Sequence, residues 1–226
     1  MPDTQVIVEV STLVIFAFTA ILAGYLTKNY LRGRRRSTLF WSIGLWLFAI
    51  GVILETAFAF GAYDALLIDV YLFIVALLVN SLALGSMELL GNSRLKTYYY
   101  VFSAVTLTAL AFSLAFTSPG DLLLNYVVAV PLPMLTTITS SFVTFPAAVI
   151  LVVIAAKSFM KTRSKKMLSI IAGVVVVSIA GSLYIAAFPA FLYYSEFIGI
   201  VLLWLGFFDF GAHRRAAPEK LAHSRR

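Results

Sequence analysis

The sequence predicts an all-α integral membrane protein, a polytopic bundle of seven transmembrane helices with its N-terminus outside and its C-terminus in the cytoplasm. Of its 226 residues, 62% are hydrophobic and 12% are charged, whereas soluble domains are nearer half apolar and a quarter charged. Apolar segments of about 20 residues, the length that crosses a bilayer, follow one another along the chain. Basic residues gather in alternate connections between these segments, as they do in cytoplasmic loops.

The first half of the chain divides into four predicted helices, at residues 6–27, 38–60, 68–90 and 98–116. The basic stretch 28–36 lies between the first two helices and contains four arginines. The next connection carries Asp64 and no base. The third connection, between the helices predicted at 68–90 and 98–116, contains Arg94 and Lys96.

The second half is less regular. Residues 122–130 are apolar but too short to span, and Pro131 and Pro133 interrupt a helix there. We expect a short interfacial or re-entrant segment on the outer side, followed by helices at 134–156, 168–188 and 194–210. Pro146 is expected to kink the first of these. The bundle would occupy residues 1–211, and residues 212–226 would form a basic cytoplasmic tail.

Basic side chains set the predicted topology. With the N-terminus outside, every Lys and Arg falls on the cytoplasmic side. Those expected to fix the orientation and to contact lipid headgroups are Arg34, Arg35, Arg36, Lys165, Lys166, Arg214 and Arg215. We therefore expect a multi-pass protein of a prokaryotic plasma membrane, with membrane lipids as partners. The net charge of +7 is explained by topology, so no nucleic-acid partner is predicted.

Missing residue types exclude several chemistries. The chain has no cysteine, and its two histidines, His213 and His223, both lie in the tail. Intramembrane zinc hydrolysis and haem ligation by histidine need imidazole within the bundle. We therefore predict no enzymatic activity, no metal and no cofactor.

Glu55 is the principal site candidate, since it lies about 7 Å from the outer end of its predicted helix. An ionisable group at that depth is costly to charge and faces the bundle or a wet cavity. It is either a proton or cation site or a structural hydrogen-bonding group. Asp69, Tyr71 and Glu196 are expected at the same end, where they would line an acidic vestibule or belong to an ordinary aromatic belt.

Hydroxyl groups form the other candidate. Thr137, Ser140, Ser141 and Thr144 recur at helical spacing, so they share one face of the helix at 134–156. That face would line a polar cavity or bond to neighbouring helices as packing contacts. Further polar residues that could join it are Asn80, Ser178, Ser182 and Tyr184.

The spacing of Trp41, Gly44-Leu45-Trp46, Gly51 and Glu55, followed by Tyr71, Leu84-Gly85 and Leu89-Leu90, resembles two groups of proteins. They are uncharacterised seven-helix membrane proteins of prokaryotes and the seven-helix sensor modules of histidine kinases. The likeness covers two helices and implies no activity, and the short tail leaves no room for a kinase output domain. The topology also resembles that of microbial rhodopsins, but no lysine lies in the seventh helix to bind retinal.

We therefore expect a non-enzymatic sensor, ligand-binding protein or accessory subunit that binds a small apolar or amphipathic ligand within the bundle. A signal would pass through the basic face to a membrane or cytoplasmic protein partner. The alternatives are a small proton-coupled transporter that uses Glu55 and a purely structural subunit of a membrane complex.

Overall fold

The structure is a computed structural model, and it describes residues 2–62, 64–117, 123–124, 127–128, 132–163, 168–170, 172–173, 176 and 189–207. Its helices are α1 (Pro2–Gly33), α2 (Arg36–Ala59), α3 (Ala65–Met87), α4 (Ser93–Phe116), α5 (Met134–Thr162) and α7 (Pro189–Phe207). The strands β1 (Leu123–Leu124) and β2 (Val127–Val128) form a small hairpin. The prediction of a helical protein is confirmed. The predicted helix 168–188 and the tail lie largely or wholly outside the described residues.

In the described part of the chain, five helices, α1 to α5, are long and apolar enough to cross a membrane. α7 contains a shorter apolar stretch, Tyr194–Gly206. The structure thus agrees with a membrane protein, while the number of seven spans and the sides of the two termini stay predictions.

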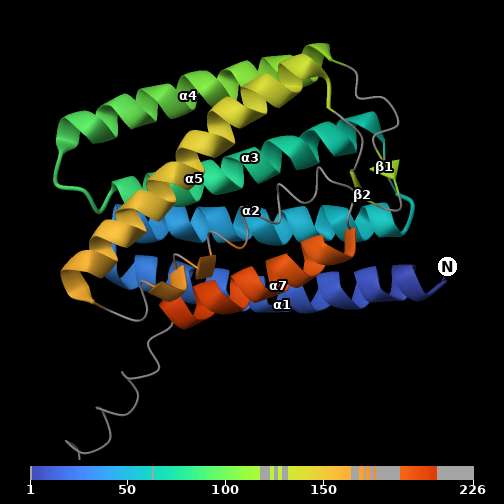
Figure 1. Cartoon of the computed structure of the whole chain (residues 1–226), viewed down its shortest axis with the longest axis horizontal. Coiled ribbons are helices and arrows are strands. Elements are labelled where there is room, and N and C mark those ends of the chain that lie inside the picture. Colours follow the sequence, from blue (N-terminus) through green and yellow to red (C-terminus); the bar gives the residue numbers. More distant parts are fainter. Residues whose placement is uncertain are drawn as a thin grey trace, which may run out of the picture.

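The helices run back and forth in one bundle (Figure 1). α1 packs on α2 and α2 on α3, and α5 crosses α3 obliquely and contacts α4. α7 lies along α1. The described basic residues lie where α1, α3 and α5 end and where α2 and α4 begin, and these helix ends gather on one side of the bundle. This placement agrees with the prediction that the basic residues lie on one side of the membrane.

The basic connection between α1 and α2 is much shorter than predicted. Residues 28–36 were expected to form a loop, but α1 continues to Gly33 and α2 begins at Arg36. Lysine and arginine are good helix formers, so the helices extend beyond their apolar parts. Arg34 ends α1 in a left-handed conformation, with φ of 48°, and its N–H donates to the Tyr30 carbonyl at 2.7 Å. α5 likewise continues to Thr162, beyond the predicted residue 156.

Other helix starts also differ from the prediction. α4 begins at Ser93, where the Asn92 side chain accepts a hydrogen bond from the Leu95 N–H at 3.3 Å. α7 begins at Pro189, earlier than the predicted residue 194, because proline suits the first turn of a helix. The start of α4 is thus set by Asn92 and the start of α7 by Pro189. In both helices this start precedes the apolar segment from which the helix was predicted.

The short segment after α4 does not cross the bundle in its described residues. Leu123 pairs with Val128 and Leu124 with Val127 in an antiparallel hairpin. The hairpin lies at the end of the bundle opposite the basic ends, near the end of α2 (Figure 1). The predicted short segment at that end is thus a hairpin, which is a small departure from an all-α chain.

Glycines allow α2 and α3 to approach closely. A Cβ on Gly85 would lie 2.5 Å from Cδ1 of Trp41 and 2.9 Å from the Ser37 carbonyl oxygen. A Cβ on Gly44 would lie 2.7 Å from a methyl carbon of Leu82. Small residues commonly permit such contacts between membrane helices. Trp41, Gly44 and Gly85 therefore form the α2–α3 packing contact.

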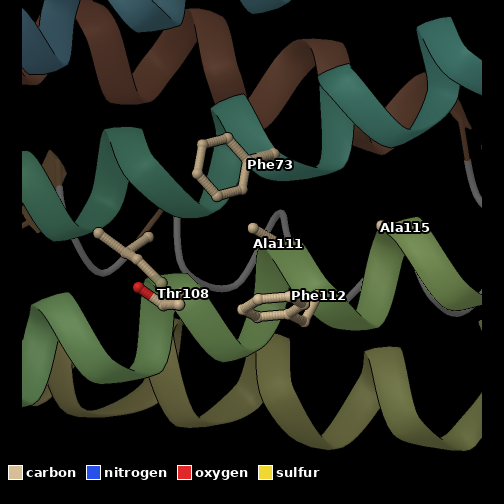
Figure 2. A pocket seen from close by; sticks show the side chains of 6 residues that line it. Phe73, Thr108, Ala111, Phe112 and Ala115 are labelled. Carbon is tan, nitrogen blue, oxygen red and sulfur yellow. The ribbon is translucent and has the colours of Figure 1, made fainter.

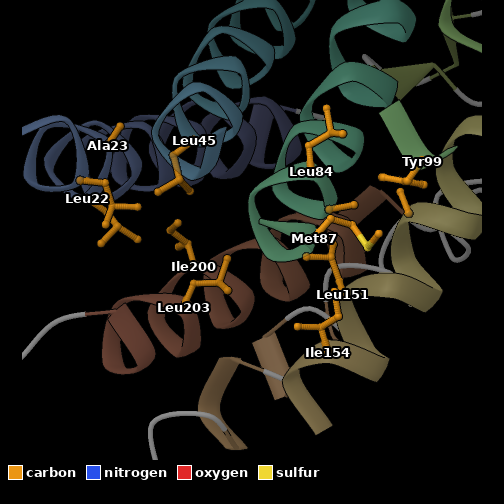
Figure 3. Close-up of a cluster of buried hydrophobic side chains, with 13 residues drawn as sticks. Leu22, Ala23, Leu45, Leu84, Met87, Tyr99, Leu151, Ile154, Ile200 and Leu203 are labelled. Carbon is orange, nitrogen blue, oxygen red and sulfur yellow. The ribbon is translucent and has the colours of Figure 1, made fainter. Parts of the chain in front are cut away.

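The largest apolar core lies toward the basic end (Figure 3). Leu22, Leu45 and Ile200 meet there from α1, α2 and α7, and all three are almost fully buried. Met87 of α3 and Leu151 of α5 continue the same cluster. This core joins α7 to the rest of the bundle.

Glu88 stabilises the turn from α3 to α4. Its carboxylate pairs with Lys96 at 3.3 Å, and Tyr100 Oη donates to Glu88 Oε1 at 2.7 Å. Lys96 and Tyr100 are one helical turn apart, so both reach Glu88, whereas Arg94 is exposed. The hydrogen bond from Tyr100, then Lys96 and the charge of Arg36, lower the pKa of Glu88.

Replacing Gly85 by alanine is expected to destabilise the fold by about 1–3 kcal/mol, because the added methyl group meets the Ser37 backbone as well as the Trp41 ring. Gly51→Ala is the control, since nothing lies within 4 Å of the position that its added methyl group would take. The free energy of unfolding in mixed detergent micelles measures both. Equal stability of the two variants would contradict the tight α2–α3 contact.

The Glu88 cluster is expected to contribute about 1 kcal/mol at neutral pH. A lowered pKa means that this stability is present above the unfolded-state pKa of about 4.3 and is lost as pH falls through the folded-state pKa. The difference in stability between wild type and Glu88→Gln should therefore shrink on acidification. Arg94→Gln is the control and should change nothing, and an equal loss in that variant would instead support a pair between Glu88 and Arg94.

Candidate functional site

The candidate site is built around Glu55, one turn before the end of α2. Its side chain is only 7% exposed, and Tyr71 Oη of α3 donates to its Oε1 at 2.6 Å. α2 and α3 are antiparallel and joined by a short turn, which brings these two residues to the same depth. Phe58 packs edge-on against the Tyr71 ring and fixes its position. Glu55 Oε2 is buried without a hydrogen-bond partner among the described residues.

A second buried carboxyl, that of Glu196 on α7, lies near Glu55. Glu196 is 8% exposed, and its Oε2 also has no hydrogen-bond partner within the described part of the chain. The two carboxyls are close enough for their charges to repel each other. The fold thus brings together two acids from α2 and α7. We call them the carboxyl pair.

Thr12 of α1 lies at the level of the carboxyl pair and was missed by sequence reasoning. Ile15 and Val52 share one packing cluster between the antiparallel helices α1 and α2. Thr12 lies one helical turn from Ile15, and Glu55 lies one turn from Val52, both toward the end of the bundle opposite the basic residues. Thr12 and Glu55 therefore lie at the same depth in the bundle. Thr12 is fully buried. The sequence could have indicated its burial, because Thr12 lies three residues before Ile15 on the helix face that also holds Thr19 and Leu22.

The carboxyl pair lies far from the described cations. All Lys and Arg residues in the described ranges lie at the opposite end of the bundle. An isolated carboxylate within an apolar bundle is costly, and two adjacent ones repel each other as well. The arrangement can hold a proton or attract a small cation. No group of three or more His, Cys, Asp or Glu side chains suited to a metal occurs in the described part.

The predicted acidic vestibule forms only in part. Glu55, Tyr71 and Glu196 come together, whereas Asp69 stands two residues before Tyr71 and points to a different side of α3. Asp69 is half-buried, and its Oδ1 has no hydrogen-bond partner among the described residues. Acidic residues at one end of a bundle therefore do not all share one site.

Asn80 faces α4 and not the hydroxyl groups of α5, contrary to the sequence-based expectation. Its Oδ1 accepts hydrogen bonds from Tyr99 Oη at 3.1 Å and from Ser103 Oγ at 2.9 Å. Nine residues separate Asn80 from Tyr71, a rotation of about 180° around a helix. The two side chains thus lie on opposite faces of α3. Glu55 and Asn80 consequently do not line one cavity.

The hydroxyl stripe on α5 does not face the bundle interior, so this expectation is corrected. Thr137 and Ser141 are exposed, and Ser140 and Thr144 are half-buried. Ser141 Oγ donates to the Thr137 carbonyl at 2.7 Å and Thr144 Oγ1 to the Ser140 carbonyl at 2.9 Å. These hydroxyls therefore bond within their own helix. Among the described residues, these bonds do not join α5 to a neighbouring helix.

The buried hydroxyl of α5 belongs to Thr136, which the sequence interpretation passed over. Thr136 is 2% exposed and its Oγ1 lies 3.1 Å from Ser113 Oγ and 2.9 Å from Thr117 Oγ1 on the α4 side. Thr136, Val143 and Ala147 follow one buried face of the helix. This face is offset by one residue from the predicted hydroxyl stripe. Its apolar residues in the sequence could have indicated that Thr136 is buried.

An open apolar groove of about 350 Å³ lies between α3 and α4 (Figure 2). Phe73 of α3 faces Thr108, Ala111 and Phe112 of α4 across it. The groove does not include Glu55 or Glu196. It is therefore separate from the carboxyl pair.

The bond between Tyr71 and Glu55 is expected to couple α2 and α3 by about 1 kcal/mol, since hydrogen bonds between membrane helices are modest. A double-mutant cycle with Tyr71→Phe and Glu55→Gln, read as the free energy of unfolding in mixed micelles, measures this coupling. Tyr98→Phe is the control because Tyr98 is 72% exposed. Additive effects of the two substitutions would contradict the contact.

Seven predicted residues lie outside the described part of the chain: Ser178, Ser182, Tyr184, Lys165, Lys166, Arg214 and Arg215. Of the remaining ligand candidates, the structure brings together Glu55, Tyr71 and Glu196. No protein-family model, no curated protein and no solved structure matches this chain.

Proposed function

We propose that this chain is a non-enzymatic sensor or accessory subunit of a prokaryotic plasma membrane and that it responds to a proton or small cation bound by the carboxyl pair. The observation that carries the proposal is the burial of two carboxyls whose charges interact, each with one oxygen free of hydrogen bonds among the described residues. The ligand differs from the small apolar or amphipathic molecule expected from sequence, because the α5 hydroxyls that would contact it face outward or into their own helix.

A change of charge at the pair would act on the position of α7. Two carboxylates repel each other, whereas one proton or cation between them removes the repulsion and favours a close approach. Tyr71 keeps Glu55 oriented toward α3, so Glu196 is the member that can move. Binding therefore shifts the balance between two positions of α7 against α1 and α2.

α7 connects the pair to the basic end of the bundle. Phe197 packs edge-on against Phe18 of α1, and Trp204 Nε1 donates to the Phe18 carbonyl at 3.3 Å. Further along, Ile200 and Leu203 enter the main apolar core. A shift of this helix would reach the basic face, which in the proposed N-out, seven-span topology is cytoplasmic and meets a protein partner there.

The second candidate is a proton-coupled transporter that uses Glu55. It is favoured by the depth of Glu55 and by its partnership with Tyr71. Such a transporter needs the pair to open to both sides in turn, and Asn80 on the opposite face of α3 provides no polar continuation toward the midplane. The sensor is therefore the preferred function. A purely structural subunit would bind nothing at the pair.

Proton binding is expected to appear as a carboxylic-acid carbonyl band in infrared difference spectra of the full chain in nanodiscs, recorded over a pH series. Two interacting acids titrate as a pair, so Glu196→Gln should remove one band and shift the pH at which the Glu55 band changes. Glu88→Gln, at the other end of the bundle, is the control and should leave these bands unchanged.

Three outcomes separate the candidate functions. Bands that titrate without proton flux in liposomes support the sensor. Flux along a proton gradient that Glu55→Gln abolishes would establish the transporter. Spectra that contain no band sensitive to Glu55→Gln or Glu196→Gln, with or without added sodium and potassium, would leave a structural subunit and overturn the proposal.

A further inference from the structure

An open cavity of about 440 Å³, lined by both polar and apolar side chains, lies between α1 and α2 at the basic end, opposite the carboxyl pair. Asn29, Arg32, Arg35 and Thr38 supply its polar wall, and Leu26 and Trp41 its apolar wall. We propose that this cavity binds the phosphate headgroup of one anionic phospholipid. The proposal does not depend on the function of the carboxyl pair, because the two sites lie at opposite ends of the bundle.

The cavity has charge available for an anion. Arg32 and Arg35 are both exposed, and neither has a carboxylate partner among the residues that the structure describes. Guanidinium groups bind phosphate through paired N–H donors, which gives them geometric selectivity as well as charge. Asn29 adds a neutral amide that can donate to a further oxygen. These side chains come from α1 and from the turn after it, so the short turn holds them together.

The start of α2 supplies a second, independent feature of the same cavity. Arg35 is the N-cap residue, its side chain makes no capping hydrogen bond, and the first turn of α2 contains no acidic residue. The first backbone bond of the helix runs from the Leu39 N–H to the Arg35 carbonyl. The N–H groups before Leu39 therefore lack intrahelical acceptors, and an anion beside Thr38 would satisfy them.

The apolar wall favours a lipid over a free phosphate ion. Leu26 is 4% exposed and Trp41 is half-buried. Leu26 lies at the end of the apolar part of α1, and Trp41 lies near the start of the apolar part of α2. A phosphate ion alone would use only the polar wall, whereas the glycerol and upper chain of a phospholipid would also contact the half-buried Trp41 ring. Basic pockets between membrane helices are a known type of site for anionic headgroups. The size also falls within the range of small-molecule sites.

Native mass spectrometry of the full chain, released from nanodiscs of equal parts phosphatidylcholine and phosphatidylglycerol, tests the site. We expect one tightly retained phosphatidylglycerol per chain. Arg32→Gln with Arg35→Gln should weaken its retention, measured by titration in detergent, by about tenfold or more, since two charge-assisted hydrogen-bonding groups are lost. The matched control is Arg34→Gln with Arg36→Gln, which removes the same charge from the same turn but from residues outside the cavity wall.

Substitution of both arginines by lysine keeps the positive charge at the site but removes the planar guanidinium groups. It therefore distinguishes the contribution of charge from that of guanidinium geometry. Arg32→Lys with Arg35→Lys should fold as wild type does and retain the lipid with intermediate affinity, because lysine lacks the planar fork. Equal weakening by the cavity variant and by the control would show diffuse attraction and overturn the proposal. Displacement of the lipid by inorganic phosphate or glycerol phosphate at equal concentration would assign the cavity to a free phosphate compound instead.

Discussion

The close contact between α2 and α3 is the constraint on which the rest of the bundle depends. Gly44 and Gly85 remove the side-chain carbons that would hold the two helices apart, and Trp41 fills the space beside Gly85. The same antiparallel alignment sets Glu55 opposite Tyr71, further along the helix pair. The packing contact and the site are therefore parts of one helix pair.

The two ends of the bundle have opposite electrostatic character. At one end the carboxyls of Glu55 and Glu196 are buried, and at the other the arginines of the α1–α2 turn are exposed. Buried acids respond to protons and cations, whereas exposed arginines respond to anions and headgroups. α7 contains Glu196 near one end and joins the apolar core toward the other. It is thus the element through which the two ends can influence each other.

Periodicity and charge located most of the helices, but they did not assign the helix faces. Thr136 and Thr137 are neighbours of the same residue type, yet a rotation of about 100° buries one against Ser113 and Thr117 and exposes the other. Asn80 was expected beside α5 and lies against α4 for the same reason. In a chain that is apolar on all sides, the position of the neighbouring helices decides which polar group is buried.

The sequence by itself determined the helical class, the apolar lengths and the gathering of basic residues in alternate connections, because hydropathy and charge act locally along the chain. It also singled out Glu55, since an acid within an apolar run is conspicuous in one dimension. The pairing of Glu55 with Glu196, the bond from Tyr71 and the cavity between Arg32 and Arg35 emerged only in the tertiary structure. These features join residues of different helices, and the rotation and depth of each helix are set by packing against its neighbours and not by its own sequence.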